Sequence, residues 1–189
     1  MTKLSATASQ TAGPFVHLGL TDHGSVARLA SEEYEGEHIR LRCRMFDGDG
    51  MPVTDAIIEI WQADSAGNYA QTHEARTKSS RFRGFGRLAL AEDGSCLFET
   101  IKPGCVAGPA STRQAPHINV SIFARGLLKR LATRIYFENE RNNDKDPVLG
   151  LVPPDRRRTL MARQNSGHPN EWEFVIRLCC ENETVFFDV

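Results

Sequence analysis

Along much of the chain, hydrophobic and polar residues alternate with a period of two, which is the pattern of half-buried β-strands. In the clearest case, His38–Phe46, four hydrophobic side chains share one side and three arginines share the other. The hydrophobic ones are Ile39, Leu41, Cys43 and Met45. This pattern predicts a strand with one face on a core. Residues 47–50, Asp-Gly-Asp-Gly, supply the positive-φ positions of a hairpin turn.

Further strand patterns follow, separated by turn residues. They cover residues 56–63, 84–90, 96–99, His117–Ala124, Leu131–Phe137, 172–178 and a short C-terminal stretch, 184–189. Residues 56–63 are hydrophobic on both faces through Ile57, Ile58, Ile60 and Trp61, which suits a strand covered on both sides. Residues 96–99 are expected to be the hairpin mate of 84–90.

One helix is predicted, residues 155–163, entered through Pro153 and Pro154. Seven or eight short strands with turns between them predict a mostly β protein, a Greek-key β-sandwich with long loops, an N-terminal arm and one or two short helices. We place the arm at residues 1–37 and the sandwich at 38–189. Residues 71–83 are also polar and irregular, and loops of that length tend to be functional or to form interfaces.

Composition and charge argue against nucleic-acid-binding, membrane and secreted proteins. The net charge of -1 over 189 residues gives no electrostatic case for nucleic acid or for an anionic membrane. No apolar run approaches the roughly 20 residues that span a bilayer, and the N-terminus lacks the apolar core of a secretory signal peptide. The expectation is a cytoplasmic protein. Five cysteines without Cys-x-x-Cys spacing suggest buried, reduced thiols.

The residues alone reveal no catalytic constellation. Six histidines are dispersed, and no pair has the i, i+2 or i, i+4 spacing that would place two imidazoles on one face. No nucleophile elbow, phosphate-binding loop or zinc-protease motif occurs. Without further comparison, the sequence indicates a β-sandwich with no recognisable catalytic or metal-binding motif.

Six short segments, in order along the chain, nevertheless resemble the intradiol ring-cleavage dioxygenases. They are Ser-Gln-Thr-Ala-Gly-Pro-Phe-Val-His at 9–17, Ile-Glu-Ile-Trp-Gln-Ala-Asp-Ser-Ala-Gly-Asn-Tyr at 58–69, Ile-Lys-Pro-Gly at 101–104, Ala-Pro-His-Ile-Asn-Val-Ser-Ile-Phe-Ala-Arg-Gly at 115–126, Thr-Arg-Ile-Tyr-Phe at 133–137 and Glu-Thr-Val-Phe-Phe-Asp at 183–188. The resemblance therefore covers nearly the whole chain. It implies a cytoplasmic enzyme of aromatic catabolism that is an alpha–beta hetero-oligomer.

The resemblance also implies Fe(3+) held by two tyrosines and two histidines, but this chain departs from that ligand set. Val106 stands where the iron-binding chain has a tyrosine, and His117-Ile118-Asn119 replaces its His-x-His pair. Gln114 replaces an arginine, and residues 71–83, which should hold the other tyrosine, contain none. Ferric iron is a hard cation that favours phenolate and imidazole, so valine and amide are poor substitutes. We therefore expect no metal ligand and no catalytic residue here, with the iron in a beta subunit.

Two segments are predicted to bind substrate at the shared interface. The resemblance implies that Thr11, Gly13, Pro14 and Phe15 form one wall of the cavity. A Gly-Pro pair suits that place, because glycine permits close backbone approach and proline fixes the direction of the chain. Arg125 would bind the ring carboxylate of 3,4-dihydroxybenzoate. An ordinary turn of the arm and a surface or interface salt bridge are the alternatives for these two features.

The implied reaction is O2-dependent cleavage of 3,4-dihydroxybenzoate to 3-carboxy-cis,cis-muconate in the beta-ketoadipate pathway. A non-catalytic β-sandwich module for binding or assembly is the alternative from another class. A self-sufficient enzyme acting on catechol or hydroxyquinol would need all four iron ligands in one chain, and at least three are missing here.

Overall fold

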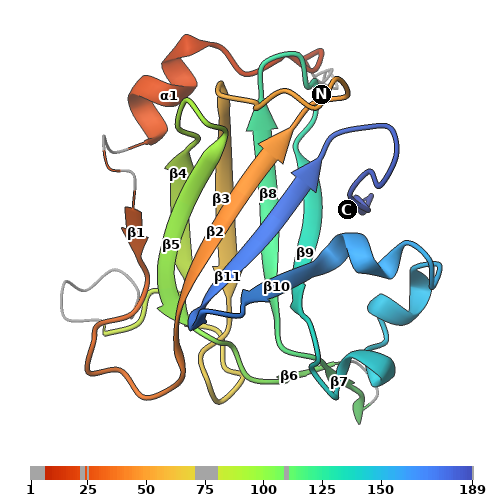
Figure 1. Ribbon diagram of the computed structural model, residues 1–189. Coiled ribbons are helices and arrows are strands. Elements are labelled where there is room, and N and C mark those ends of the chain that lie inside the picture. The colour runs from red at the N-terminus through yellow and green to blue at the C-terminus, as the bar shows by residue number, and fades with distance from the viewer. Residues whose placement is uncertain (1–6, 22–23, 25, 71–80, 109–110, 189) are drawn as a thin grey trace, which may run out of the picture.

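The computed structural model describes residues 7–21, 24, 26–70, 81–108 and 111–188. Strands dominate this part of the chain, with one short α-helix and three 3-10 turns (Figure 1). The helix is α1 (Pro14–Leu20), and the 3-10 turns are η2 (Asn143–Lys145), η3 (Leu149–Leu151) and η4 (Arg157–Leu160). The strands are β1 (Val26–Arg28), β2 (His38–Phe46), β3 (Ala56–Gln62), β4 (Phe85–Ala89), β5 (Ser95–Ile101), β6 (Val106–Ala107), β7 (Arg113–Gln114), β8 (His117–Ala124), β9 (Leu131–Phe137), β10 (Met161–Asn165) and β11 (His168–Arg177).

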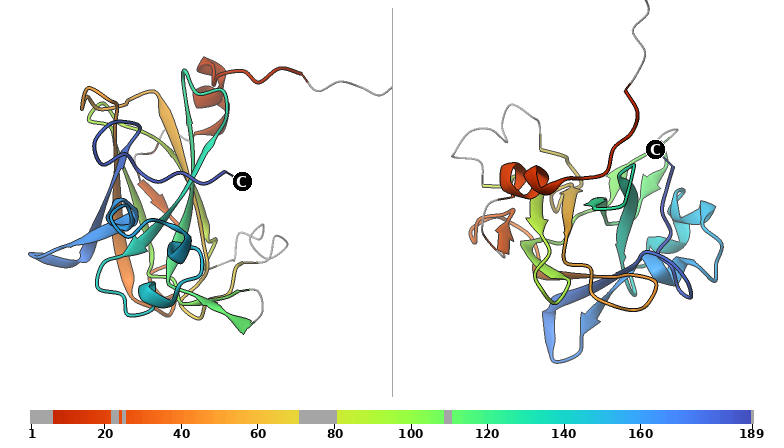
Figure 2. Two further views of the ribbon diagram at one scale, coloured as in Figure 1. Left: turned by 90° about the vertical axis from the view of Figure 1, so that its right-hand side faces the viewer. Right: turned by 90° about the horizontal axis from the view of Figure 1, so that it is seen from above.

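Nine of these strands form one sheet in the order β1-β5-β2-β11-β10-β9-β8-β3-β4. The sheet folds over so that β5, β2 and β11 face β4, β3, β8 and β9 (Figures 1 and 2). β10 joins the layers, because it pairs antiparallel with β11 and parallel with β9. The opposite edges meet through hydrogen bonds from Arg83 N to Leu29 O and from Ser31 N to Arg81 O, both 2.8 Å long. The predicted mostly β sandwich is confirmed, as a single and nearly closed sheet.

The core lies between the two layers, and the period-two pattern places residues in it. In β2, Ile39, Leu41, Cys43 and Met45 are buried while the arginines between them face outward, as predicted. β3 departs from its prediction at its end. Trp61 is 48% exposed, whereas Gln62 is fully buried and donates from Nε2 to Ile101 O at 2.8 Å. A hydrogen-bonded amide can occupy the core, so polarity alone did not reveal which residue faces inward.

One of the two predicted hairpins is wrong in its pairing, and the other forms but is short. β4 pairs only with β3 within the sheet, and β5 pairs with β1 and β2 in the other layer, so the turn at Gly94 connects the two layers. The turn at residues 47–50 folds back only as far as a bridge from Phe46 to Pro52, and β2 does not pair with β3. Turn residues predict that the chain reverses direction, but they do not predict which strand the next strand pairs with.

The predicted helix at 155–163 is also wrong. Its first part is η4, and from Met161 the chain enters β10, where Met161 and Ala162 pair with Tyr136 and Phe137 of β9. The hydrogen bonds that join the layers thus replace helical ones. The predicted C-terminal strand is reduced to one bridge, from Ala132 to Phe187, and residue 189 lies outside the described residues.

Candidate functional site

The first residue of β8 begins a chain of hydrogen bonds at the predicted ligand positions. The Nδ1 atom of His117 lies 2.7 Å from Ala115 O, and Nε2 lies 3.3 Å from the hydroxyl of Tyr69. A carbonyl can only accept, so Nδ1 carries the proton and Nε2 accepts from Tyr69. Asn119 Nδ2 in turn donates to the Tyr69 oxygen at 3.1 Å. The bonds therefore run in one direction, from Asn119 through Tyr69 and His117 to the backbone.

Burial keeps the side chains of His117 and Tyr69 uncharged. It lowers the pKa of His117 from its usual 6.5 and raises the pKa of Tyr69 from its usual 10.0. A neutral imidazole and a neutral phenol are the forms that this hydrogen-bond arrangement needs. The ring of Tyr69 is also held against Trp61, with 4.4 Å between the centroids.

Tyr69 is the residue of this site that sequence reasoning missed. It stands eight residues after Trp61, and a turn returns it through a bridge to Ala63. The Asp64 carboxylate closes that turn by accepting from the backbone N–H groups of Ala66 and Asn68, each at 2.9 Å. An Asp-x-x-Gly-Asn turn is visible in the sequence, but its partner on β8 is not.

The other predicted ligand positions do not supply donors for iron. Val106 in β6 pairs with Gln114 in β7 and offers only hydrocarbon, and Gln114 Oε1 accepts from Arg134 Nη1 at 2.7 Å. Residues 71–80, where the remaining tyrosine position should fall, lie outside the described residues. Within the described part of the chain, no three His, Cys, Asp or Glu side chains gather as a metal site. Both nitrogens of His117 are engaged, so the described residues do not fit ferric iron.

Two of the predicted substrate-binding residues, Thr11 and Arg125, belong to segments that meet at the far end of β8. Thr11 Oγ1 accepts a hydrogen bond of 2.6 Å from Gly126 N, which joins the N-terminal arm to the turn that carries Arg125. The Arg125 side chain is 80% exposed, and its Nε forms an ion pair of 2.8 Å with Asp55. Two segments more than 100 residues apart in sequence are therefore neighbours in space.

The residues around Thr11 are open to solvent. Phe15, on α1, is 81% exposed. Pro14 begins that helix, whose first turn includes a hydrogen bond from Val16 N to Gly13 O of 3.0 Å. A side chain at Gly13 would meet nothing within 4 Å, so no contact with the described residues requires glycine there. These residues would need a second chain to form the wall of a cavity.

The two sites lie at opposite ends of the molecule. His117 begins β8 and Arg125 follows its end, and a strand rises roughly 3.3 Å per residue, so about 25 Å separates them. In Figure 1, α1 lies at the top and β6 and β7 at the bottom. α1 and the described residues before it therefore lie at the other end of the sheet from the altered ligand site.

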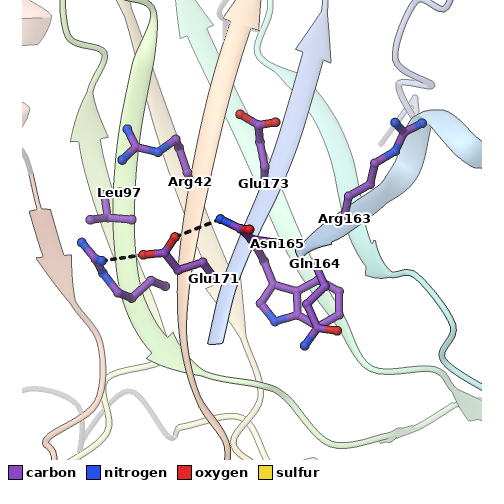
Figure 3. A pocket seen from close by; sticks show the side chains of 9 residues that line it. Arg42, Leu97, Arg163, Gln164, Asn165, Glu171 and Glu173 are labelled. Carbon is purple, nitrogen blue, oxygen red and sulfur yellow. Dashed lines mark hydrogen bonds and ion pairs between the residues drawn. The ribbon is translucent and has the colours of Figure 1, made fainter. Parts of the chain in front are cut away.

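Two hollows lie on the outer faces of the layers. One of about 260 Å³ is lined by charged residues of β2, β10 and β11 (Figure 3). Glu171 accepts there from Arg40 Nη1 at 2.8 Å and from Asn165 Nδ2 at 3.3 Å, so Arg40 and Glu171 neutralise each other. A larger hollow of about 540 Å³ adjoins Asn119 and is lined in part by Trp61, Phe85 and Leu151.

Among the helices in the described part of the chain, none has the length and hydropathy needed to cross a membrane. The cytoplasmic location stays a prediction.

Comparison with known proteins shows the family. The family model described as "Dioxygenase" matches residues 11–178. The chain is 43% identical to the protocatechuate 3,4-dioxygenase alpha chain of Pseudomonas putida, over 98% of this chain and 97% of that one. It is 31% identical to the protocatechuate 3,4-dioxygenase beta chain of Burkholderia cepacia, over 85% of this chain and 73% of that one.

Solved structures agree on the fold. The 3-chlorocatechol 1,2-dioxygenase of Rhodococcus opacus 1CP superposes with a TM-score of 0.64 at 20% identity, over 91% of this chain and 71% of that one. The strand order, the motifs of β3 and β8 and these full-length matches lead to one conclusion. The chain belongs to the intradiol ring-cleavage dioxygenase family.

Proposed function

We propose that this chain is the alpha subunit of protocatechuate 3,4-dioxygenase. With a protocatechuate 3,4-dioxygenase beta subunit, it would cleave 3,4-dihydroxybenzoate with O2 to 3-carboxy-cis,cis-muconate, in the beta-ketoadipate pathway. The observation that carries this proposal is the full-length similarity to alpha chains, and it is supported by predicted ligand positions whose described residues do not fit ferric iron. The alpha chain of Burkholderia cepacia, 41% identical over the whole of both chains, adds to this support.

The ferric iron of the holoenzyme would be bound by the beta subunit and not by this chain. Bound there, the metal would supply activation of the catechol ring toward O2. The tasks left to this chain are to shape the cavity, to exclude water and to recognise the substrate anion.

Arg125 is our proposed carboxylate-binding residue. Its guanidinium is exposed at the end of β8, and its only described ion pair, with Asp55, is at the surface, where such pairs contribute about 0–1 kcal/mol. The side chain can therefore exchange Asp55 for a substrate carboxylate at little cost. A bidentate guanidinium–carboxylate pair inside a closed interface would be stronger than the surface pair that it replaces.

The N-terminal arm, residues 1–37, is our proposed contribution to the partner interface. Thr11, Gly13, Pro14 and Phe15 would form one wall of the active site of the beta subunit. The exposed ring of Phe15 and the open space around Gly13 support this role, because both leave surface for a second chain. The hydrogen bond from Gly126 N to Thr11 would hold the arm beside Arg125.

The test is to purify the full chain alone and together with the beta subunit, and to measure iron, visible absorbance and cleavage of protocatechuate. We expect a colourless, iron-free chain alone and a coloured, active complex. Stoichiometric iron with a tyrosinate charge-transfer band in the chain alone would contradict the ligand assignment. Failure to form any complex, with no iron in either sample, would favour a non-catalytic binding or assembly module.

A further inference from the structure

Two adjacent cysteines lie at the surface, just beyond the end of β11. Cys179 and Cys180 are both exposed, and their Sγ atoms lie 2.7 Å apart. The prediction of buried thiols holds for Cys43 and Cys96 but is wrong for this pair. No part of the proposed function uses these two thiols.

The loop that carries them is fixed by hydrogen bonds. Thr184 N donates to Arg177 O at 3.0 Å, and Arg177 N donates to Thr184 Oγ1 at 2.9 Å, which closes the base of the loop. Cys180 has a φ of 71°, in the left-handed region, and its carbonyl accepts from Glu183 N at 3.2 Å. The loop therefore holds both side chains in one arrangement.

The neighbouring turn after β2 leaves space for the pair at Gly48. A Cβ atom at this position would lie 2.5 Å from Cys179 Sγ and 3.4 Å from Cys180 Sγ. Gly48 is not among the glycines with a positive φ, so its backbone would accept alanine. What it provides is room for the two sulfur atoms.

A direct disulfide is a strained outcome for this pair. The Cα atoms of residues joined by a trans peptide are about 3.8 Å apart, below the 4.4–6.8 Å that disulfides usually span. A single soft atom bonded to both sulfurs forms a larger ring and avoids this strain. The hydrogen bond with Cys180 raises the pKa of Cys179, so this thiol keeps its proton at neutral pH.

We propose that Cys179 and Cys180, packed against Gly48, form a dithiol site for trivalent arsenic, as arsenous acid or a monosubstituted arsonous acid. Each S–H group transfers its proton to a hydroxyl on arsenic, which leaves as water while an S–As bond forms. Arsenic stays trivalent and no electrons are transferred. Two bonds to one atom make the adduct resistant to single thiols.

The test uses the full chain, prereduced, with phenylarsonous acid as the probe and intact-mass spectrometry as the readout. We expect one phenylarsenic group per chain, at the mass expected after loss of two waters. An excess of a monothiol should leave it bound, and a small 1,2-dithiol should remove it. An adduct that monothiols strip, or an internal disulfide formed in place of an adduct, would overturn the proposal.

Variants separate this pair from the other thiols. C179S and C180S should each weaken retention about a hundredfold, the effect of losing one of two linked bonds. C105S, which removes a partly exposed thiol elsewhere, is the matched control and should bind as the wild type does. Loss of binding in C105S with retention in C179S would assign the adduct to another site and refute ours.

G48A tests the packing without removing a sulfur. Its Cβ should force the two Sγ atoms apart and weaken retention of the probe several-fold, while a monofunctional alkylating reagent still labels both cysteines. Unchanged retention in G48A would refute the role that we give to Gly48.

Discussion

At the scale of single residues, the identity of a few side chains decides what chemistry this chain can hold. Asn119 in place of a second imidazole and Val106 in place of a phenol remove two donors. The structure adds that Tyr69 and His117 satisfy each other. A group whose hydrogen bonds are all made within the chain is a structural element and not a vacant ligand.

Arg125→Ala should raise the KM for protocatechuate about tenfold or more in the complex, because a hydrogen bond to a charged group contributes about 1.5–3 kcal/mol. Steady-state kinetics with protocatechuate and with catechol, which lacks the carboxylate, would measure the difference. Lys129→Ala, which removes another exposed cation from the same turn, is the control and should leave both constants unchanged. Equal losses with both substrates would exclude the carboxylate role.

Tyr69→Phe should lower the free energy of unfolding by about 1–2 kcal/mol, because it leaves His117 Nε2 and Asn119 Nδ2 without their shared partner. Urea denaturation at constant m-value is the measurement. Tyr34→Phe is the control. Tyr34 donates only to Asp64 Oδ2, and Asp64 remains partly exposed, so the expected loss is below about 1 kcal/mol. If Tyr34→Phe lowered the free energy of unfolding more than Tyr69→Phe does, the hydrogen bonds of Tyr69 would not be the stronger contribution to stability.

His117 should make stability depend on pH. Its pKa is lowered in the folded state, so the unfolded chain binds a proton more readily. The contribution is therefore fully present above about pH 6.5 and is lost as the pH falls through 6.5 toward the lower folded-state pKa. His117→Gln should show a flatter decline in unfolding free energy between pH 7 and 5 than the wild type. Parallel profiles would show that this imidazole titrates equally in both states.

At the scale of elements, one buried carboxylate joins β9, η3 and the residues between β7 and β8. Asp146 accepts from Ala115 N, Tyr136 Oη, Val148 N and Leu149 N at 2.7–3.0 Å. Three of these donors are backbone groups, and those of Ala115 and Leu149 would otherwise be buried and unpaired, which is costly. The sequence shows an aspartate in a polar loop and gives no sign of this role, since its donors come from three separate segments.

Asp146→Ala should cost about 3 kcal/mol or more, because it leaves several buried donors unpaired. Tyr136→Phe removes one donor only, so about 1–2 kcal/mol is expected. A double-mutant cycle read by urea denaturation would give a loss smaller than the sum of the single losses. Additive losses would show that the two side chains do not act together.

At the scale of the whole molecule, closure of the sheet divides the N-terminal segment into two parts. β1 covers the edge of β5, and Leu29, which is buried, lies beside the junction with the segment before β4. Thr11 and α1 lie farther out and are largely exposed. The outer part can therefore serve a partner, while the inner part belongs to the fold.

Two truncations should separate these parts. A chain without residues 1–13 should keep its urea midpoint but lose activity in the complex with the beta subunit. A chain without residues 1–30 should be destabilised and prone to aggregate, because it exposes the edge of β5 and removes Leu29 from the core. Light scattering and urea denaturation would distinguish them. Equal destabilisation in both would show that the outer arm is also part of the fold.

The sequence by itself determined several of the strands and the side chains that are absent at the predicted ligand positions. The alternation in β2, β8 and β9 follows from local geometry, and a valine or an amide lacks the needed donor in any fold. The tertiary structure alone decided the partners: β5 with β2 and not with β4, Tyr69 with His117, and Thr11 with the turn after Arg125. It also converted the predicted helix at 155–163 into η4 and β10. The physical reason is that burial periodicity acts between neighbours along the chain, whereas pairing is a competition among segments far apart.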